Sequence, residues 1–237
     1  MFPIIIPYHV DVPMRCWPWM NWVLIGITVF CYPLAGDSFV LGESLFSWVG
    51  HILAHADLLH LFGNMLFLWV FGNAVCAKVG NLTYPFIYFG LGLVAGFVSY
   101  AIDPHPAVGA SGAINGVVGM FIVWYFLNEI SCWYFFWFFG LHEGGTFSVS
   151  SFWIILLWVA FDIWNAVRGD SNIDHIAHLA GFVAGFLLAV ALLKLRWVKM
   201  ERGERSLLQA LTGDVQKRSI NHKIRRTRRR LHKPDSQ

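Results

Sequence analysis

The chain has 237 residues, of which 57% are hydrophobic and only 13% are charged, and it contains 21 Phe and 12 Trp. Soluble domains carry about a quarter charged residues, so this composition argues against a water-soluble globule and favours a membrane-embedded domain. The formal net charge of +3 conceals a partition. Residues 1–193 hold three basic and ten acidic residues, a balance of −7, whereas residues 194–237 hold fourteen basic and four acidic residues, a balance of +10.

The cysteines and the N-terminal residues exclude two further classes of protein. The four cysteines are far apart and form no C-x-x-C pair, so we expect buried thiols rather than a disulfide scaffold or a zinc ribbon. The first residues lack a basic region and are interrupted by Pro3, Pro7 and Pro13, which argues against a cleaved signal peptide. We therefore expect the first hydrophobic helix itself to direct insertion.

Six apolar stretches are long enough, or nearly so, to span a bilayer as helices. They are 19–35, 56–76, 83–102, 111–130, 151–168 and 174–195. We therefore predict an all-α polytopic membrane protein with a six-helix domain over 19–195, a cytoplasmic segment over 1–18 and a basic cytoplasmic tail over 196–237. Sixteen Lys and Arg residues lie on one side of the predicted spans and one, Arg168, on the other, which predicts that both termini are cytoplasmic.

The stretch 131–150 lies between the fourth and fifth predicted spans. Seven consecutive aromatic residues, Trp133 to Phe139, precede His142 and Glu143. This apolar run is too short to span, so we expect a re-entrant or hairpin loop in the membrane interface.

The C-terminal tail is too short to form a second core. Leucines recur at helical spacing from Leu207, and five arginines crowd the stretch 225–230. We expect this basic run to mark the cytoplasmic side and to lie on anionic lipid headgroups. No aromatic or motif support for nucleic-acid binding accompanies it, so we expect no nucleic-acid partner.

Polar residues within the apolar stretches are few, and their positions indicate one shared depth. In the predicted topology the second, fourth and sixth spans run from outside to inside, so their first turns lie near the outer leaflet. Late residues of the fifth span reach the same depth. The residues concerned are His55, His60, Asn64, Ser111, Asn115, Asp162, Asn165, His175 and His178. Such groups are costly within a membrane and by default suggest a functional site.

Ser111 opens the fourth span within the sequence Gly109-Ala110-Ser111-Gly112. A nucleophile at a helix N-terminus has its own backbone N–H directed at an oxyanion that forms on the attacked carbonyl. Gly109 allows a sharp turn into the helix, and Gly112 allows a neighbouring helix to approach closely. The motif alone is weak, because a serine that merely caps the helix is the commoner case.

His178 is followed by Gly181 and Gly185 on its own helix face. This stripe of small residues can pack against the small-residue stripe of the fourth span, which would bring an imidazole nitrogen within reach of a serine hydroxyl. Without Ser111, a histidine merely hydrogen-bonded between helices would be an equal alternative.

His60 and Asn64 are i, i+4 neighbours in the second span, and both side chains can donate hydrogen bonds to a developing negative charge. His51 and His55 have the same spacing, which suits a metal pair. No acidic residue on that face completes a metal site, so we expect neither a metal nor another cofactor.

These motifs, in this order, resemble those of the rhomboid intramembrane serine proteases of the six-helix bacterial type, over roughly residues 20–195. The stretch from His60 to Leu68 is also similar to the family. One departure is visible: Phe46-Ser47, followed by Trp48, stands where the family often has a Trp-Arg pair in its first luminal or periplasmic loop.

The resemblance implies hydrolysis of transmembrane protein segments by a Ser–His dyad, in a multi-pass protein of the bacterial inner membrane. It implies Ser111 as nucleophile and His178 as general base and acid. The oxyanion would be held by the backbone N–H groups of Ser111 and Ala110 and by the side chains of His60 and Asn64. Asp162 suggests a triad, but because the family works as a dyad we expect it to face water.

Two other functions compete with the protease. A non-catalytic rhomboid-like protein would bind transmembrane helices without cutting them, yet such relatives lose the serine or the histidine, and this chain has both. A transporter, or a protein with a histidine-bound metal or haem, would be indifferent to Ser111→Ala.

Overall fold

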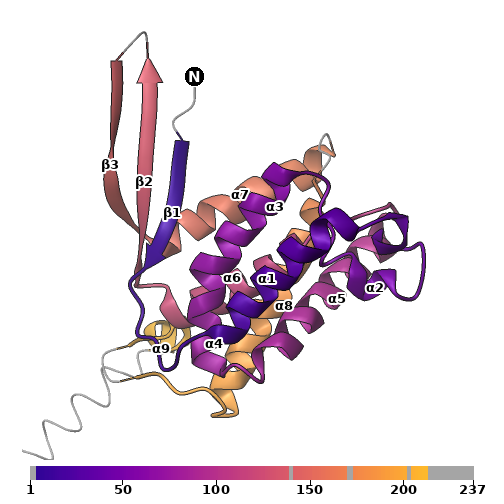
Figure 1. The fold of residues 1–237 in the computed structure, drawn as a ribbon. Coiled ribbons are helices and arrows are strands. Elements are labelled where there is room, and N and C mark those ends of the chain that lie inside the picture. Colours follow the sequence, from indigo (N-terminus) through magenta and orange to yellow (C-terminus); the bar gives the residue numbers. More distant parts are fainter. Residues whose placement is uncertain (1–3, 139–140, 170–172, 202–203, 213–237) are drawn as a thin grey trace, which may run out of the picture.

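The computed structural model describes residues 4–138, 141–169, 173–201 and 204–212. A bundle of helices forms the body of the protein, and a three-stranded antiparallel sheet extends away from one side of it (Figure 1). The helices are α1 (Trp19–Cys31), α2 (Ser47–Gly50), α3 (Leu58–Phe67), α4 (Asn73–Val79), α5 (Tyr84–Ile102), α6 (Ser111–Tyr125), α7 (Ser151–Arg168), α8 (His175–Lys194) and α9 (Leu207–Thr212). The strands are β1 (Ile4–Val10), β2 (Glu129–Phe138) and β3 (Leu141–Ser150).

Four helices in the described part of the chain are long and apolar enough to cross a membrane. They are Leu58–Val79, Tyr84–Ile102, Ser151–Arg168 and His175–Lys194. The first of them runs through α3, a π-helical turn (η3, Leu68–Gly72) and α4. Two shorter apolar helices, Trp19–Leu34 and Ser111–Tyr125, coincide with the other two predicted stretches. The second of these ends five residues before the predicted limit of 130, because the chain turns there into β2.

Burial distinguishes the central helix of the bundle from the outermost one. In α6, only Ser111 and Asn115 escape full burial, which is typical of a helix that is apolar on all sides and surrounded by others. In α7, by contrast, only Ser151 and Ile155 are buried. The site residues at the start of α6 therefore rest on a fixed central element, whereas those on α7 rest on a peripheral one.

The packing of α6 against α8 depends on glycines, as their spacing predicts. A Cβ atom on Gly181 would lie 2.0 Å from the carbonyl oxygen of Gly112. A Cβ atom on Gly185 would lie 1.8 Å from the carbonyl oxygen of Gly116. No side chain fits at either distance, so the two backbones touch directly and fix the relative height of Ser111 and His178.

The three-stranded sheet corrects the prediction of an all-α fold. Strands β2 and β3 pair as an antiparallel hairpin, which agrees with the hairpin alternative for the stretch 131–150, and β1 adds a third strand by pairing with β2, as at Ile5 and Tyr134. Val10, Ile130 and Cys132 are buried, so the base of the sheet joins the core of the bundle. The sequence conceals this sheet because the β1–β2 pairing joins segments more than a hundred residues apart, and because the aromatic run lacks the alternation of a half-buried strand.

The segment after α8 packs against the end of the bundle opposite the N-terminus of α6. Lys78 at the end of α4 forms a buried ion pair with Glu204, and Arg15 forms an ion pair of 2.7 Å with Glu201. Val198 is buried there as well. The beginning of the predicted tail, 196–237, is thus attached to the bundle, while the arginine-rich stretch 225–230 lies outside the described residues.

Candidate active site

Ser111 is the first residue of α6, and the backbone before it requires glycine. Gly109 has a φ of +132°, which L side chains rarely adopt. A Cβ atom there would lie 2.8 Å from Cε1 of His60 and 3.7 Å from Oγ of Ser111. Gly109 therefore lets the His60 imidazole lie beside the Ser111 hydroxyl.

The cap of α6 shows whether Ser111 serves to cap the helix or leaves its hydroxyl free of that role. The N-cap residue is Ala110, and no side chain caps this helix. Ser111 occupies the first helical position, so the alternative of a serine that caps the helix is wrong. The backbone N–H groups of the first turn of a helix have no partner within the helix.

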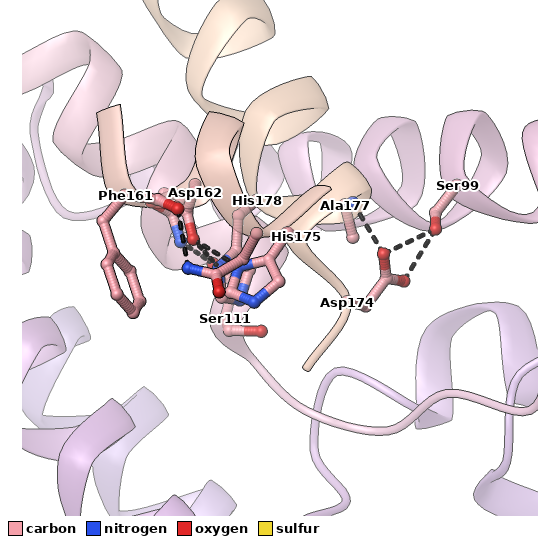
Figure 2. Close-up of polar contacts among 10 residues, drawn as sticks. Ser99, Ser111, Phe161, Asp162, Asp174, His175, Ala177 and His178 are labelled. Carbon is pink, nitrogen blue, oxygen red and sulfur yellow. Dashed lines mark hydrogen bonds and ion pairs between the residues drawn. The ribbon is translucent and has the colours of Figure 1, made fainter. Parts of the chain in front are cut away.

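His178 lies in the first turn of α8, where two carboxylates form hydrogen bonds with the start of this helix. Asp174 caps the helix by accepting a hydrogen bond of 2.8 Å from the backbone N–H of Ala177, and its two oxygens lie 2.7 Å from the Ser99 hydroxyl of α5 (Figure 2). These bonds tie the start of α8 to α5. Our sequence reasoning missed this cap, although an Asp immediately before an apolar helix is its usual signal.

The second carboxylate is that of Asp162 on α7. One of its oxygens, Oδ1, lies 2.6 Å from Nδ1 of His175 and 3.1 Å from Nδ1 of His178 (Figure 2). Asp162 therefore contacts the predicted general base, rather than simply facing water as we expected. Among the described residues, these three are the group of ligand-bearing side chains close enough to hold a metal ion.

His60 and Asn64 lie one turn apart in α3, as their spacing predicts. Asp57 caps this helix, and its Oδ1 accepts a hydrogen bond of 2.8 Å from the backbone N–H of His60. Asn64 is only 8% exposed, and its Nδ2 has no hydrogen-bond partner among the described residues. A buried amide donor without an acceptor is costly in a folded protein, so this amide can accommodate an acceptor atom that arrives with a ligand.

Two further histidines, His51 and His55, lie close to this group, and burial lowers the pKa of each. Burial lowers the pKa of His51, whose Nδ1 lies 3.0 Å from the carbonyl oxygen of Ser47. Burial and the neighbouring His60 lower the pKa of His55 to about 4. The rings of His55 and His60 contact each other edge to face, 5.1 Å apart. His51 and His55 belong to no metal-binding group among the described residues.

The structure brings the three motifs to one end of the bundle. Both His60 and Ser111 lie close to the Cα of Gly109, and α6 meets α8 where Gly112 faces Ala177, the residue before His178. A cavity of about 20 Å³, lined by Ser111, His51 and Asp174 among others, lies at this junction. That volume is close to the space occupied by one water molecule. Among the described residues, no hydrogen bond joins the Ser111 hydroxyl to His178.

The comparison with known proteins identifies the fold. The family model described as "Rhomboid domain" matches residues 42–195, which include every residue of the site. The chain belongs to the rhomboid family. With four helices able to cross a bilayer, it is a membrane protein of that family.

Several curated relatives are similar to this rhomboid. "Rhomboid protease GluP" of Bacillus subtilis (strain 168) is 32% identical over 141 residues, which cover 60% of this chain but only 25% of GluP. "Putative rhomboid protease YdcA" of the same organism is 26% identical over 177 residues, which cover 72% of this chain and 80% of YdcA. "Rhomboid-like protein 11, chloroplastic" of Arabidopsis thaliana is 27% identical over 168 residues, covering 66% of this chain and 56% of that protein.

The loop that departs from the usual family sequence has its own anchors in this rhomboid. The ring of Trp48 packs edge to face on Tyr100 at 5.6 Å, and Phe46 packs edge to face on Phe39 at 5.2 Å. Aromatic contacts of this kind contribute to stability beyond the buried area alone. The backbone of this loop thus stays beside the site: Gly109 donates a hydrogen bond of 2.8 Å to the carbonyl oxygen of His51.

Proposed function

We propose that this rhomboid is an intramembrane serine endopeptidase that cleaves transmembrane segments by a dyad of Ser111 and His178. One observation carries the proposal: the glycine-mediated contact of α6 with α8 places a serine at an uncapped helix N-terminus and a histidine at the same end of the bundle. The names of the relatives GluP and YdcA, both described as rhomboid proteases, support the same activity.

The reaction begins when Oγ of Ser111 attacks the carbonyl carbon of the scissile peptide bond. His178 accepts the hydroxyl proton, and a tetrahedral intermediate forms with a negative oxygen. The C–N bond then breaks as His178 gives its proton to the leaving amine, which leaves an ester on Ser111. A water molecule, deprotonated by His178, attacks this ester, and the proton returns to Ser111 as the acid product departs.

The oxyanion is held, in this proposal, by the backbone N–H groups of Ser111 and Ala110 and by the side chains of His60 and Asn64. Gly109 leaves space for the His60 ring near Ser111, and the Asn64 amide is a buried donor without a partner in the part of the chain that the structure describes. Losing one such donor costs on the order of 10²–10³ in rate.

The orientation of the protein also belongs to the proposal. Arg15, Lys78 and the start of the basic tail meet at the end of the bundle opposite the site. Because positive residues mark the cytoplasmic side, both termini lie in the cytoplasm and the site lies near the outer leaflet. We place the protein in a bacterial inner membrane, with the arginine-rich tail on anionic headgroups.

The test is cleavage of a tagged single-pass membrane protein whose transmembrane segment contains small or helix-destabilising residues. Wild-type protein should cleave it, whereas Ser111→Ala and His178→Ala should each lose on the order of 10⁴ or more in kcat. Matched folding is checked by thermal unfolding in detergent. Cleavage by Ser111→Ala at the wild-type rate would show that residues other than Ser111 carry out the reaction.

A further inference from the structure

We propose that Asp162 is a positioning residue for His178: its carboxylate holds the imidazole in one tautomer and stabilises the imidazolium formed during cleavage. The inference rests on the proposed function and extends the dyad of Ser111 and His178 to a relay of three groups. It assigns to α7, the most exposed of the long helices, a direct part in the chemistry.

The geometry of the contact carries the proposal. Oδ1 of Asp162 lies 3.1 Å from Nδ1 of His178, and both side chains are largely buried, with exposed fractions of 13% and 14%. An ion pair or hydrogen bond in such a place is less screened by water than one on the surface. Asp162 is therefore more than a solvated residue at the end of a span.

The atoms engaged determine what each nitrogen of His178 can do. Because a carboxylate only accepts hydrogen bonds, Nδ1 of His178 must carry a hydrogen and donate it in the hydrogen bond to Asp162. The neutral imidazole then has its lone pair on Nε2, which is the form needed to accept the Ser111 proton. When it does so, both nitrogens are protonated, and the nearby carboxylate stabilises the new positive charge without itself taking up a proton.

His175 shares the same carboxylate oxygen, at 2.6 Å from its Nδ1. One carboxylate oxygen can accept two hydrogen bonds, so His175 does not displace His178. Instead, the shorter bond fixes Asp162 on the side of α8 while α7 has few other buried contacts. We infer that His175 holds Asp162 in place and that its loss has a smaller effect than the loss of Asp162.

The same three side chains could alternatively hold a metal ion, since their ligand atoms lie within 4.8 Å of one another. The present distances of 2.6 and 3.1 Å are those of hydrogen bonds. The positioning role and a metal site make different predictions, because only a metal site responds to chelation and to zinc content.

The experiment compares wild-type protein with Asp162→Asn, Asp162→Glu and His175→Gln, by cleavage of the single-pass substrate and by covalent labelling of Ser111 with a fluorophosphonate. Asp162→Asn keeps the shape but allows the wrong tautomer, so kcat should fall by on the order of 10²–10⁴ with KM nearly unchanged. Asp162→Glu should recover part of this loss. His175→Gln should lose about 10-fold or less.

The pH profile of labelling separates a positioning role from a merely structural one. The titratable side chains that interact with His178 are Asp162 on α7, His175 on α8 and His60 on α3. Asp162 is the negative member of this set, so its neutralisation in Asp162→Asn should change the shape of the pH profile, whereas a merely structural loss should leave that shape unchanged. The matched control is Asn165→Ala, because within the described part of the chain the Asn165 amide donates only to the Phe161 carbonyl in its own helix. This control should keep the wild-type rate and profile.

Three results would overturn the proposal. The first is that Asp162→Asn keeps at least a third of the wild-type kcat and an unchanged pH profile while Ser111→Ala is inactive. This result refutes the role of Asp162 and leaves the proposed protease function standing. Activity that survives in Ser111→Ala refutes the proposed function and the relay together. One equivalent of zinc in purified wild-type protein, absent from Asp162→Asn, assigns the cluster to a metal. Asp162→Asn could also lower the unfolding temperature. In that case the activity of Asp162→Glu and the pH profile decide whether Asp162 positions His178. Both are measured well below the unfolding temperatures of the wild-type and variant proteins.

Discussion

Two buried asparagines of this rhomboid show how differently the same side chain is used in the two halves of the bundle. The amide of Asn21 donates to the carbonyl oxygen of Leu68 at 2.8 Å and to Oδ1 of Asn73 at 2.9 Å, and it accepts from the Tyr84 hydroxyl at 2.9 Å. The Nδ2 of Asn64, which lies in the same long helix as Asn73, has no partner among the described residues.

The Asn21 network explains a local irregularity of that helix. In the π-helical turn η3 the regular backbone bonds are interrupted, and Asn21 occupies the carbonyl oxygen of Leu68 at its start. Gly72 makes room, since a Cβ atom there would lie 2.5 Å from Oδ1 of Asn21. Buried polar groups whose hydrogen bonds are made stabilise the fold. The amide of Asn64, which has no partner among the described residues, costs stability and suits a ligand. The two asparagines therefore differ in whether their hydrogen bonds are completed among the described residues.

The sharpest way to break this comparison is Asn64→Ala. We expect cleavage to fall by on the order of 10²–10³, because an oxyanion donor is lost. The free energy of unfolding should change little or rise, because a buried unsatisfied group is also removed. Substrate cleavage and thermal unfolding in detergent measure both quantities on one sample. Loss of stability together with unchanged cleavage would place Asn64 in the structural class.

Asn21→Ala should give the opposite result. Removing this amide leaves the Leu68 carbonyl, the Asn73 amide and the Tyr84 hydroxyl short of partners, so we expect a loss of about 2–3 kcal/mol in the free energy of unfolding. Ser111 labelling per folded molecule should remain that of wild type. A variant as stable as wild type would show that the network contributes nothing.

His55 tests the same contrast through pH. Neither of its buried ring nitrogens has a hydrogen-bond partner within the described residues, and burial lowers its pKa to about 4. The unfolded chain binds the proton near pH 6.5, so the folded state is unaffected above that value and loses stability as pH falls toward 4.

We expect wild-type protein to lose roughly 1–2 kcal/mol more than His55→Gln between pH 7 and pH 5. Unfolding midpoints of the two proteins at both pH values provide the measurement. Parallel pH dependence would mean that His55 is hydrated or paired in the folded protein.

Most helices and the meeting of Ser111 with the His60 motif were predictable from the sequence, because apolar length and glycine spacing are local signals. Helices α5 and α7 begin and end within a residue of the predicted limits. The hairpin of β2 and β3 was one of two predicted alternatives, but its pairing with β1 was not predictable, since the two segments are more than a hundred residues apart. Nor was the bond of Asp162 to His178, because depth alone does not say which face of α7 turns toward α8. The Asn21 network escaped notice for the same reason.

The most direct test of the account is the site of covalent labelling by a fluorophosphonate, mapped by mass spectrometry in detergent where the protein stays folded. We predict modification at Ser111 in wild-type protein and, in His178→Ala, labelling at least about 10²-fold slower at equal stability. Absence of labelling at Ser111, or labelling that is indifferent to His178, would contradict the assignment of these two residues as nucleophile and base.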